Sequence, residues 1–226
     1  DYSVAHKLHG MMAGIPENMG GIPVESCING VHTIGWIITQ DMFAEHPEYF
    51  GMDENGVRQP NRQPCLSNPE VLEIVINAAK AHFAQYTSIF SVSQNDNQNF
   101  CKCSECVAFN NEHGGVDSAS MLNFTNKVAK AIKEEYPERM VETLAYQLTE
   151  APPTGLTIED NVVIRLCPIQ TCVLHDLDDA AGAKARGAQL DEALRIVHGG
   201  DPARRLDLLA PGHVPGHQPF KARQKR

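Results

Sequence analysis

The spacing of apolar residues along the chain alternates between two periods, and this alternation predicts helices separated by strands. Asn68 begins an Asn-Pro-Glu sequence that offers an N-cap, a proline at the first helical position and an early acidic residue. Apolar residues then follow at helical spacing as far as Phe83. A second helical pattern starts near Ser118 or Ser120, and Pro137 stops it. Both segments are therefore expected to be amphipathic helices.

Short runs rich in apolar and β-branched residues predict the strands, and they lie at 30–34, 88–93, 140–145 and 161–166. A polar, cysteine-bearing stretch follows the second run and is expected to be a loop. Strands that alternate with helices imply parallel pairing through right-handed crossovers. We therefore expect an α/β fold, and both a β/α barrel and an open doubly wound sheet satisfy this pattern.

The charge differs between the body of the chain and its end. Residues 1–179 carry a net charge of −14 and residues 180–226 one of +5, which together give the −9 of the whole chain. An acidic body argues against nucleic acid or an anionic membrane as the partner, because both attract basic surfaces. A neutral ligand fits better. No apolar stretch approaches the ~20 residues that span a bilayer.

The composition also predicts the domain organisation. Residues 1–179 are expected to form one domain, which the family resemblance given below implies to be a partial β/α barrel. Residues 180–226 are rich in Gly, Pro, Ala and Arg and predict a poorly ordered or aberrant basic tail. A frameshift would explain the abrupt change at residue 180, and a natural basic tail is the alternative. The first residues show no signal peptide, so localisation stays open, and the periplasm or exterior of a bacterium is the location considered.

Polar residues of chemical interest directly follow the expected strands. In either architecture, the loops at the carboxyl ends of parallel strands form the active face. A phosphate loop and a Gly-x-Gly-x-x-Gly motif are both absent, so no cofactor is expected for catalysis. An amide-rich rim favours a carbohydrate instead. We expect Asp96 as a catalytic residue, and as substrate-binding residues His32, Gln94, Asn95, Asn97, Tyr146, Gln147 and Arg165.

Each of these residues has a structural alternative. Asp96 and Asn97 could simply cap or turn their loop, as short polar side chains often do. His32 could be a hydrogen-bonded histidine at a strand end, and Tyr146 a core tyrosine with a satisfied hydroxyl. Arg165 would need a carboxylate partner if buried, so an internal ion pair competes with substrate binding.

Three of the seven cysteines form a Cys-x-Cys-x-x-Cys cluster: Cys101, Cys103 and Cys106. Zinc favours four tetrahedral sulfur or nitrogen ligands, so this cluster could hold a structural zinc ion. The fourth ligand would be Cys65, His113 or Cys172. Disulfides in an exported protein and free buried thiols are the alternatives. In every case the cluster is expected to brace the neighbouring polar loop.

Several segments together resemble a family of bacterial proteins catalogued as a domain of unknown function. The resemblance covers about residues 20–179 and implies a relationship to the β/α-barrel glycoside hydrolases, some members being endo-β-N-acetylglucosaminidases. A complete barrel typically needs ~250 residues, so this chain would lack several β/α units and could be inactive. The segments are HPEYFGMDENGVRQ, PCLSNPEVLEIV, SVSQNDNQNFCKCSEC, AIKEEYPERMVETLAYQ and NVVIRLCPI.

The expected function is hydrolysis of glycosidic bonds, and the alternative is a carbohydrate-binding barrel without catalysis. Hydrolysis usually needs two carboxyl groups, although acetamido sugars can supply their own nucleophile. Asp96 is the best candidate, Glu105 a weaker one, and no Asp-Glu pair is present here. A second carboxylate facing Asp96 would favour the enzyme. Trp36, the only tryptophan, could stack on a sugar or be buried.

Overall fold

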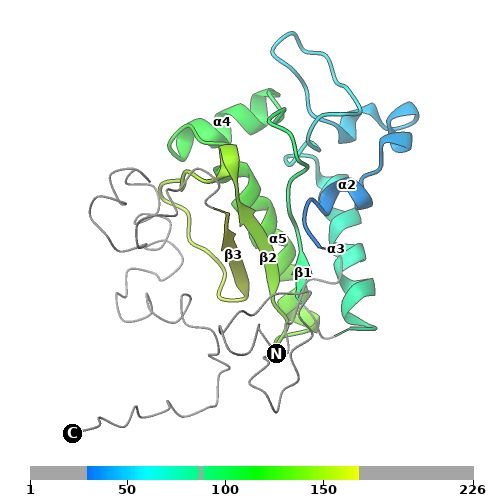
Figure 1. Ribbon diagram of the computed structural model, residues 1–226, viewed down its shortest axis with the longest axis vertical. Coiled ribbons are helices and arrows are strands. Elements are labelled where there is room, and N and C mark those ends of the chain that lie inside the picture. The colour runs from blue at the N-terminus through cyan, green and yellow to red at the C-terminus, as the bar shows by residue number, and fades with distance from the viewer. Residues whose placement is uncertain (1–29, 87–88, 168–226) are drawn as a thin grey trace, which may run out of the picture. The chain divides into compact units, whose positions relative to one another are not determined.

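The computed structural model describes residues 30–86 and 89–167, and this part of the chain is an α/β unit (Figure 1). The regions before residue 30 and after residue 167, including the basic tail at 180–226, lie outside the described residues. None of the described helices is long and apolar enough to cross a membrane. The elements are α2 (Ile34–Ile37), η2 (Gln40–Ala44), η3 (Pro47–Tyr49), α3 (Pro69–Phe83), β1 (Phe90–Ser91), α4 (Ser104–Glu112), α5 (Ser118–Glu135), β2 (Val141–Ala145), η4 (Gln147–Thr149) and β3 (Val162–Leu166).

The described strands form one sheet in the order β1-β2-β3, and both neighbouring pairs are parallel, as the alternation of strands and helices predicts. Phe90 is aligned with Val141, which is aligned with Val162, so the strands start at one level. The last two strands match the expected runs closely. Within the described part of the run 88–93, residues 89–93, the strand is limited to β1, although the amide of Val92 still donates to the carbonyl of Glu142 at 2.7 Å.

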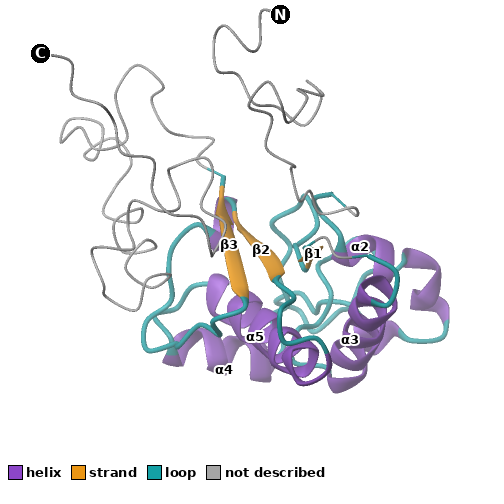
Figure 2. Ribbon diagram, turned by 90° about the horizontal axis from the view of Figure 1, so that it is seen from below, coloured by secondary structure: helices purple, strands orange, loops and turns teal. Residues whose placement is uncertain are grey.

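Helices α3 and α5 pack against each other and cover one face of this sheet (Figure 2). Both lie where the apolar spacing predicts them. Helix α3 starts at its expected cap, because the side chain of Asn68 accepts hydrogen bonds from the amides of Glu70 and Val71. The core of this layer consists of buried apolar side chains, among them Val71, Val75, Phe83, Phe90, Phe124, Val128, Ile132 and Val141.

The opposite face of the sheet carries polar and charged side chains among its apolar ones. Side chains alternate along a strand, so the aligned neighbours Ser91 and Glu142 lie on the face away from α3 and α5. Arg165 reaches the same face from β3, where it pairs with Glu142. A sheet covered by helices on both faces usually has apolar runs on both. These strands have one apolar face and one mixed face.

The run 30–34 was expected to be the first strand, and the structure shows that this prediction is wrong. The backbone of His32 is left-handed, with φ of 59°, and a helical turn follows it. Thr33 explains the change, because its Oγ1 donates to the carbonyl of Ser91 at 2.7 Å and its amide donates to Oγ of Ser93 at 3.1 Å. These tertiary bonds fold the segment against the end of β1 and override the local preference for extended backbone.

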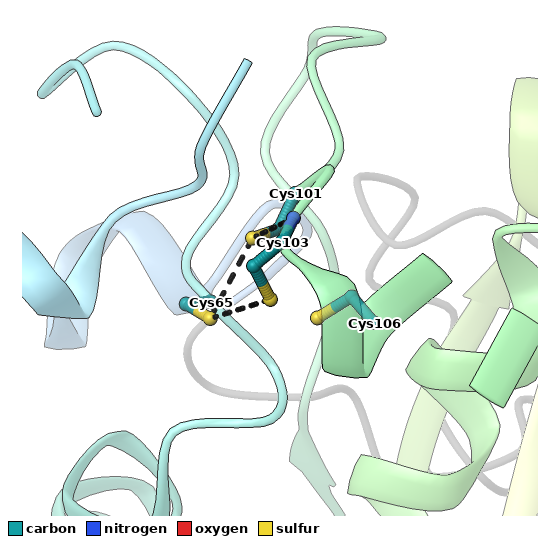
Figure 3. A group of neighbouring side chains, drawn as sticks. All are labelled: Cys65, Cys101, Cys103 and Cys106. Carbon is teal, nitrogen blue, oxygen red and sulfur yellow. Dashed lines mark hydrogen bonds between the residues drawn. The ribbon is translucent and has the colours of Figure 1, made fainter. Parts of the chain in front are cut away.

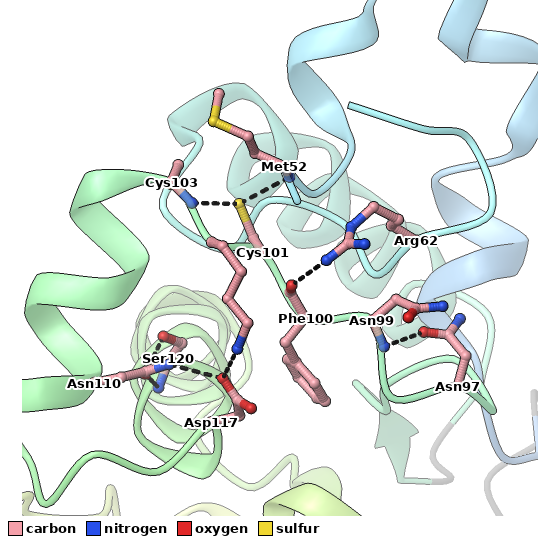
Figure 4. Close-up of polar contacts among 11 residues, drawn as sticks. Met52, Arg62, Asn97, Asn99, Phe100, Cys101, Cys103, Asn110, Asp117 and Ser120 are labelled. Carbon is pink, nitrogen blue, oxygen red and sulfur yellow. Dashed lines mark hydrogen bonds and ion pairs between the residues drawn. The ribbon is translucent and has the colours of Figure 1, made fainter. Parts of the chain in front are cut away.

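Helix α4 replaces part of the stretch that was expected to be a loop, so that prediction is also wrong. Only Cys106 and Asn110 of this helix are buried, and it therefore lacks the apolar stripe that would reveal it in the sequence. Asn110 fixes it instead. Its Oδ1 accepts from the amide of Ser120 and its Nδ2 donates to Asp117, each at 3.0 Å (Figure 4).

Candidate functional site

The rim at the carboxyl ends of the strands centres on Asp96, which lies in the turn after β1. Its exposed carboxylate accepts a hydrogen bond from the hydroxyl of Tyr146, with 3.1 Å between Oη and Oδ1. Tyr146 directly follows β2. Because β1 and β2 are parallel, their carboxyl ends meet at one edge of the sheet, and residues distant in the sequence come into contact there.

Two residues with strained backbone flank this pair. His32 and Gln147 are the described non-glycine residues with positive φ, at 59° and 53°. The ring of His32 lies 5.7 Å from that of Tyr146, and its Nδ1 is 2.8 Å from the carbonyl of Gln94. Such conformations cost about 1–3 kcal/mol each, persist only where the surroundings enforce them, and cluster at functional sites. Their position on both sides of Asp96 marks this edge as the candidate site.

The side chain of Gln63 holds the turn that carries Asp96 through hydrogen bonds to the backbone on both sides of Asp96. This residue was not among the expected site residues. Gln63 is only 1% exposed. Its Nε2 donates to the carbonyls of Asn95 and Asn97 at 2.8 and 2.9 Å, and its Oε1 accepts from the amide of Asn95 at 2.9 Å. Burying an amide is costly unless every polar atom is paired, so these bonds fix the turn in one conformation. No motif around Gln63 signals this role.

Two of the amides expected to bind substrate serve mainly to build the rim. Gln94 is buried, and its Nε2 donates to Oγ1 of Thr149 at 2.7 Å and to the carbonyl of Tyr146 at 3.2 Å. Asn97 turns its own loop, because its Oδ1 accepts from the amide of Asn99 at 2.9 Å (Figure 4). The side chain of Asn97 therefore stabilises its own turn, which was the structural alternative to substrate binding. The side chain of Asp96 instead accepts a hydrogen bond from Tyr146.

Trp36 on α2 lies next to this rim and is 65% exposed, which excludes burial in the core. The preceding residue, Gly35, packs against Asn95 so closely that a Cβ atom would lie 2.4 Å from the Oδ1 of Asn95. Helix α2 is thereby docked on the Asp96 turn. The exposed indole on this helix offers a flat apolar surface, and the turn against which the helix packs offers amide and carboxylate groups.

Arg165 and Gln147 take different positions in this site. Arg165 was expected to bind substrate or to form an ion pair within the protein, and the structure shows the ion pair. Its Nη2 and Nε lie 2.6 and 3.1 Å from Oε2 of Glu142. The side chain of Glu142 is only 3% exposed. A buried carboxylate needs such a partner. Gln147 instead lies at the rim, where its Oε1 accepts from Gln98 at 3.5 Å.

The cysteine cluster forms a second centre beside the same turn (Figure 3). Cys65 joins the three expected cysteines, and the four Sγ atoms all lie within 4.8 Å of one another. His113 takes no part in it, because its Nδ1 is 2.7 Å from the carbonyl of Thr154. Cys172 lies outside the described residues. Of the three candidates for the fourth position, the structure therefore brings Cys65 to the cluster.

The thiols of this cluster shift one another's protonation. Hydrogen bonds from Cys101 and Cys106 lower the pKa of Cys65 far below its usual range. For Cys101, the contact with Cys106 lowers the pKa. The hydrogen bond from Cys101 to Cys65 and the burial of Cys101 have the larger combined effect, and they raise the pKa of Cys101 to about 11. A thiolate at Cys65 is thus stabilised by thiols that remain protonated.

Glu150 follows η4 and lies beside an apolar pocket, and burial raises its pKa. A carboxyl group whose folded-state pKa lies above its unfolded value costs stability once it is ionised, and this cost vanishes below the unfolded pKa. We therefore expect Glu150→Gln to raise Tm at neutral pH by about 2 °C, with the gain lost as the pH falls below 4 to 5. Thermal unfolding followed across this pH range checks the prediction, and a gain that persists in acid would contradict it.

Comparison with known protein families matches residues 2–192 to the Domain of unknown function (DUF4838). A search of curated proteins finds no significant match to this sequence. The family match includes all the described strands and helices, the Asp96 rim and the cysteine cluster. The chain therefore belongs to the DUF4838 family.

Proposed function

We propose that this chain forms part of a β/α barrel whose rim binds carbohydrate, and that Asp96 takes part there in the hydrolysis of glycosidic bonds. The observation that carries the proposal is the exposed carboxylate of Asp96, oriented by the hydroxyl of Tyr146 at the carboxyl ends of two parallel strands. Active sites of β/α-barrel enzymes lie at this face.

The arrangement of the sheet supports the barrel. In a barrel the helices cover the outer face of the strands, while the inner face is filled by side chains and, near the active face, by polar groups. Helices α3 and α5 lie on one face of β1, β2 and β3. The other face carries Ser91 and the ion pair of Glu142 and Arg165. A doubly wound sheet would favour apolar residues on this face as well.

The chemistry of the rim supports a sugar as the ligand. Sugars combine apolar ring faces with many hydroxyl groups, so a site for them needs a flat apolar surface and orienting polar groups. Trp36 offers an exposed indole on α2, whose Gly35 packs against Asn95, and Asp96 and Gln147 offer carboxylate and amide groups at the rim. The acidic charge of residues 1–179 fits a neutral ligand better than an anionic one.

The contact between Asp96 and Tyr146 favours sugars that carry an acetamido group. Among the described residues, no other carboxyl group shares a hydrogen bond with Asp96, and Glu105 lies in the first turn of α4 beside the cysteine cluster. In substrate-assisted hydrolysis, the acetamido oxygen attacks the anomeric carbon while a general acid protonates the leaving oxygen, and water then opens the oxazolinium ring. An enzyme carboxylate orients the amide during the attack. Asp96 would orient the amide and Tyr146 would hold Asp96. This favours an endo-β-N-acetylglucosaminidase-like activity.

A carbohydrate-binding barrel without catalysis is the second candidate. It requires no second carboxyl group, and the hydrogen bond that the Asp96 carboxylate makes is with the hydroxyl of Tyr146. Such a protein would use Trp36 and the amides of the rim for binding, and Asp96 would only accept hydrogen bonds from sugar hydroxyls.

Substitution of Asp96 tests the proposal. We expect the chain to hydrolyse N-glycans or aryl glycosides of N-acetylglucosamine, and Asp96→Asn to lower kcat/KM by at least about 100-fold, because a positioned acid-base or orienting group contributes that much or more. The matched control is Glu73→Gln, which removes a carboxylate from the exposed side of α3. Control activity should equal that of the unsubstituted chain.

Other outcomes separate the two candidates. Unchanged hydrolysis by Asp96→Asn would remove Asp96 from the mechanism. Glycan binding without hydrolysis by the unsubstituted chain would favour the binding protein. Neither binding nor hydrolysis for any glycan in the panel would overturn the assignment of this rim to carbohydrate.

A further inference from the structure

The four sulfur atoms of the cysteine cluster have the spacing of a tetrahedral metal site. Zinc–sulfur bonds of ~2.3 Å in a tetrahedron place the sulfur atoms ~3.8 Å apart. The Sγ atom of Cys65 lies 3.8 Å from that of Cys103 and 3.6 Å from that of Cys101. A disulfide requires ~2.05 Å between sulfurs. The described cysteines are all free, and within the cluster Cys65, Cys101 and Cys106 are buried and Cys103 is half-buried.

The surroundings of the cluster supply hydrogen-bond donors and positive charge to the sulfurs. The amides of Met52 and Cys103 donate to the Sγ of Cys101 at 3.3 and 3.5 Å (Figure 4). Cys103 is the N-cap of α4 and Cys106 lies in its first turn, where the helix dipole favours negative charge. Arg58 lies against the sulfurs as well. Four thiolates on a divalent ion carry a net charge of −2, and these groups compensate it.

The cluster also joins segments that are distant in the sequence, as structural metal sites do. Cys65 lies just before α3, Cys101 lies after the Asp96 turn, Cys103 is the N-cap of α4 and Cys106 lies within that helix. Gly51 permits this approach, because a Cβ atom there would lie 2.8 Å from the carbonyl of Gln63 and 3.3 Å from the Cα of Cys101. The backbone is therefore arranged for close contact around the sulfurs.

From these observations we propose that Cys65, Cys101, Cys103 and Cys106 bind one structural zinc ion. Four sulfur ligands close the coordination sphere, so the ion has no open position for water or substrate. Its role is to fix the segment 95–101, and with it Asp96, to the base of α3 and the start of α4. The metal assignment does not rest on the proposed function, because occupancy is measured without any glycan.

Metal analysis of the full chain tests this proposal. We expect one zinc per chain by elemental mass spectrometry of protein purified without metal-affinity resin. Cys65→Ser and Cys101→Ser should each lower the occupancy at least about tenfold, since the loss of one thiolate removes a major part of the affinity. The matched controls are Cys167→Ser, a free cysteine outside the cluster, and His113→Ala, which removes a rejected ligand candidate; both should keep one zinc.

A spectroscopic readout keeps the test decisive if a serine variant fails to fold. Cobalt(II) substituted into the unsubstituted chain should show intense visible absorption and sulfur-to-cobalt charge transfer, as four thiolate ligands in a tetrahedron produce. Iron in place of zinc would overturn the zinc assignment. A chain purified without any bound metal would overturn the site altogether, whether the cluster thiols are free or joined in disulfides. The intact mass distinguishes these two states, because each disulfide lowers it by two hydrogens.

Discussion

Replacing Gln63 with leucine is expected to lower the free energy of unfolding by about 3 kcal/mol, because the buried amides and carbonyls of the Asp96 turn lose their partner. The side chain of Gln63 makes hydrogen bonds with three backbone atoms of Asn95 and Asn97, and the shorter, apolar side chain of leucine can make none of them. Leucine leaves the amide of Asn95 and the carbonyl of Asn97 without this partner, whereas the carbonyl of Asn95 still accepts from the amide of Asn97 at 2.8 Å. Urea unfolding of the two proteins measures the difference.

The same substitution should also weaken any ligand that uses Asp96, because the turn would no longer be held in one conformation. Gln98→Leu is the matched control, since Gln98 is exposed in the same loop and should change stability by no more than about 0.5 kcal/mol. Gln63→Glu should be as damaging as leucine, because a carboxylate would face the carbonyls of Asn95 and Asn97. Full stability in both Gln63 variants would show that the turn is held by something else.

Removing zinc should produce the largest change in stability. An ion whose free concentration is about a thousandfold above its Kd contributes about 4 kcal/mol to the free energy of unfolding. A structural zinc site can contribute more. We expect a chelator to lower the urea midpoint of the unsubstituted chain and of Cys167→Ser alike. Cys101→Ser should unfold at a low midpoint that the chelator leaves unchanged. An unsubstituted chain whose midpoint ignores the chelator would contradict a stabilising metal.

The parts of this fold that local patterns encode could be predicted from the sequence. Helix α3 carries both its cap at Asn68 and an apolar stripe, and β2 and β3 are short β-branched runs bounded by turns. The run 30–34 has the same local character, yet it folds into a turn. Its conformation depends on bonds from Thr33 to Ser91 and Ser93, some sixty residues away, which no local pattern contains.

The candidate site shows the same division. Position after a strand identifies Asp96 and Tyr146, because parallel strands bring their carboxyl ends together. No local pattern identifies Gln63, which holds the Asp96 turn. Gln63 is one amide in a stretch of turns, and its hydrogen-bond partners lie more than thirty residues further along the chain. Likewise, spacing identifies the Cys-x-Cys-x-x-Cys motif, whereas the choice of Cys65 over His113 as its neighbour depends on the packing of the chain.

The most direct test of the central claim, that the rim around Asp96 binds carbohydrate, uses the fluorescence of Trp36. This residue is the only tryptophan of the chain, is 65% exposed and lies on α2, which packs against the Asp96 turn through Gly35, so its emission reports on the surroundings of α2. Titration with oligosaccharides of N-acetylglucosamine should shift the emission to the blue and saturate, and Tyr146→Phe should weaken the binding. An emission spectrum that stays unchanged with every glycan at millimolar concentration would contradict the account.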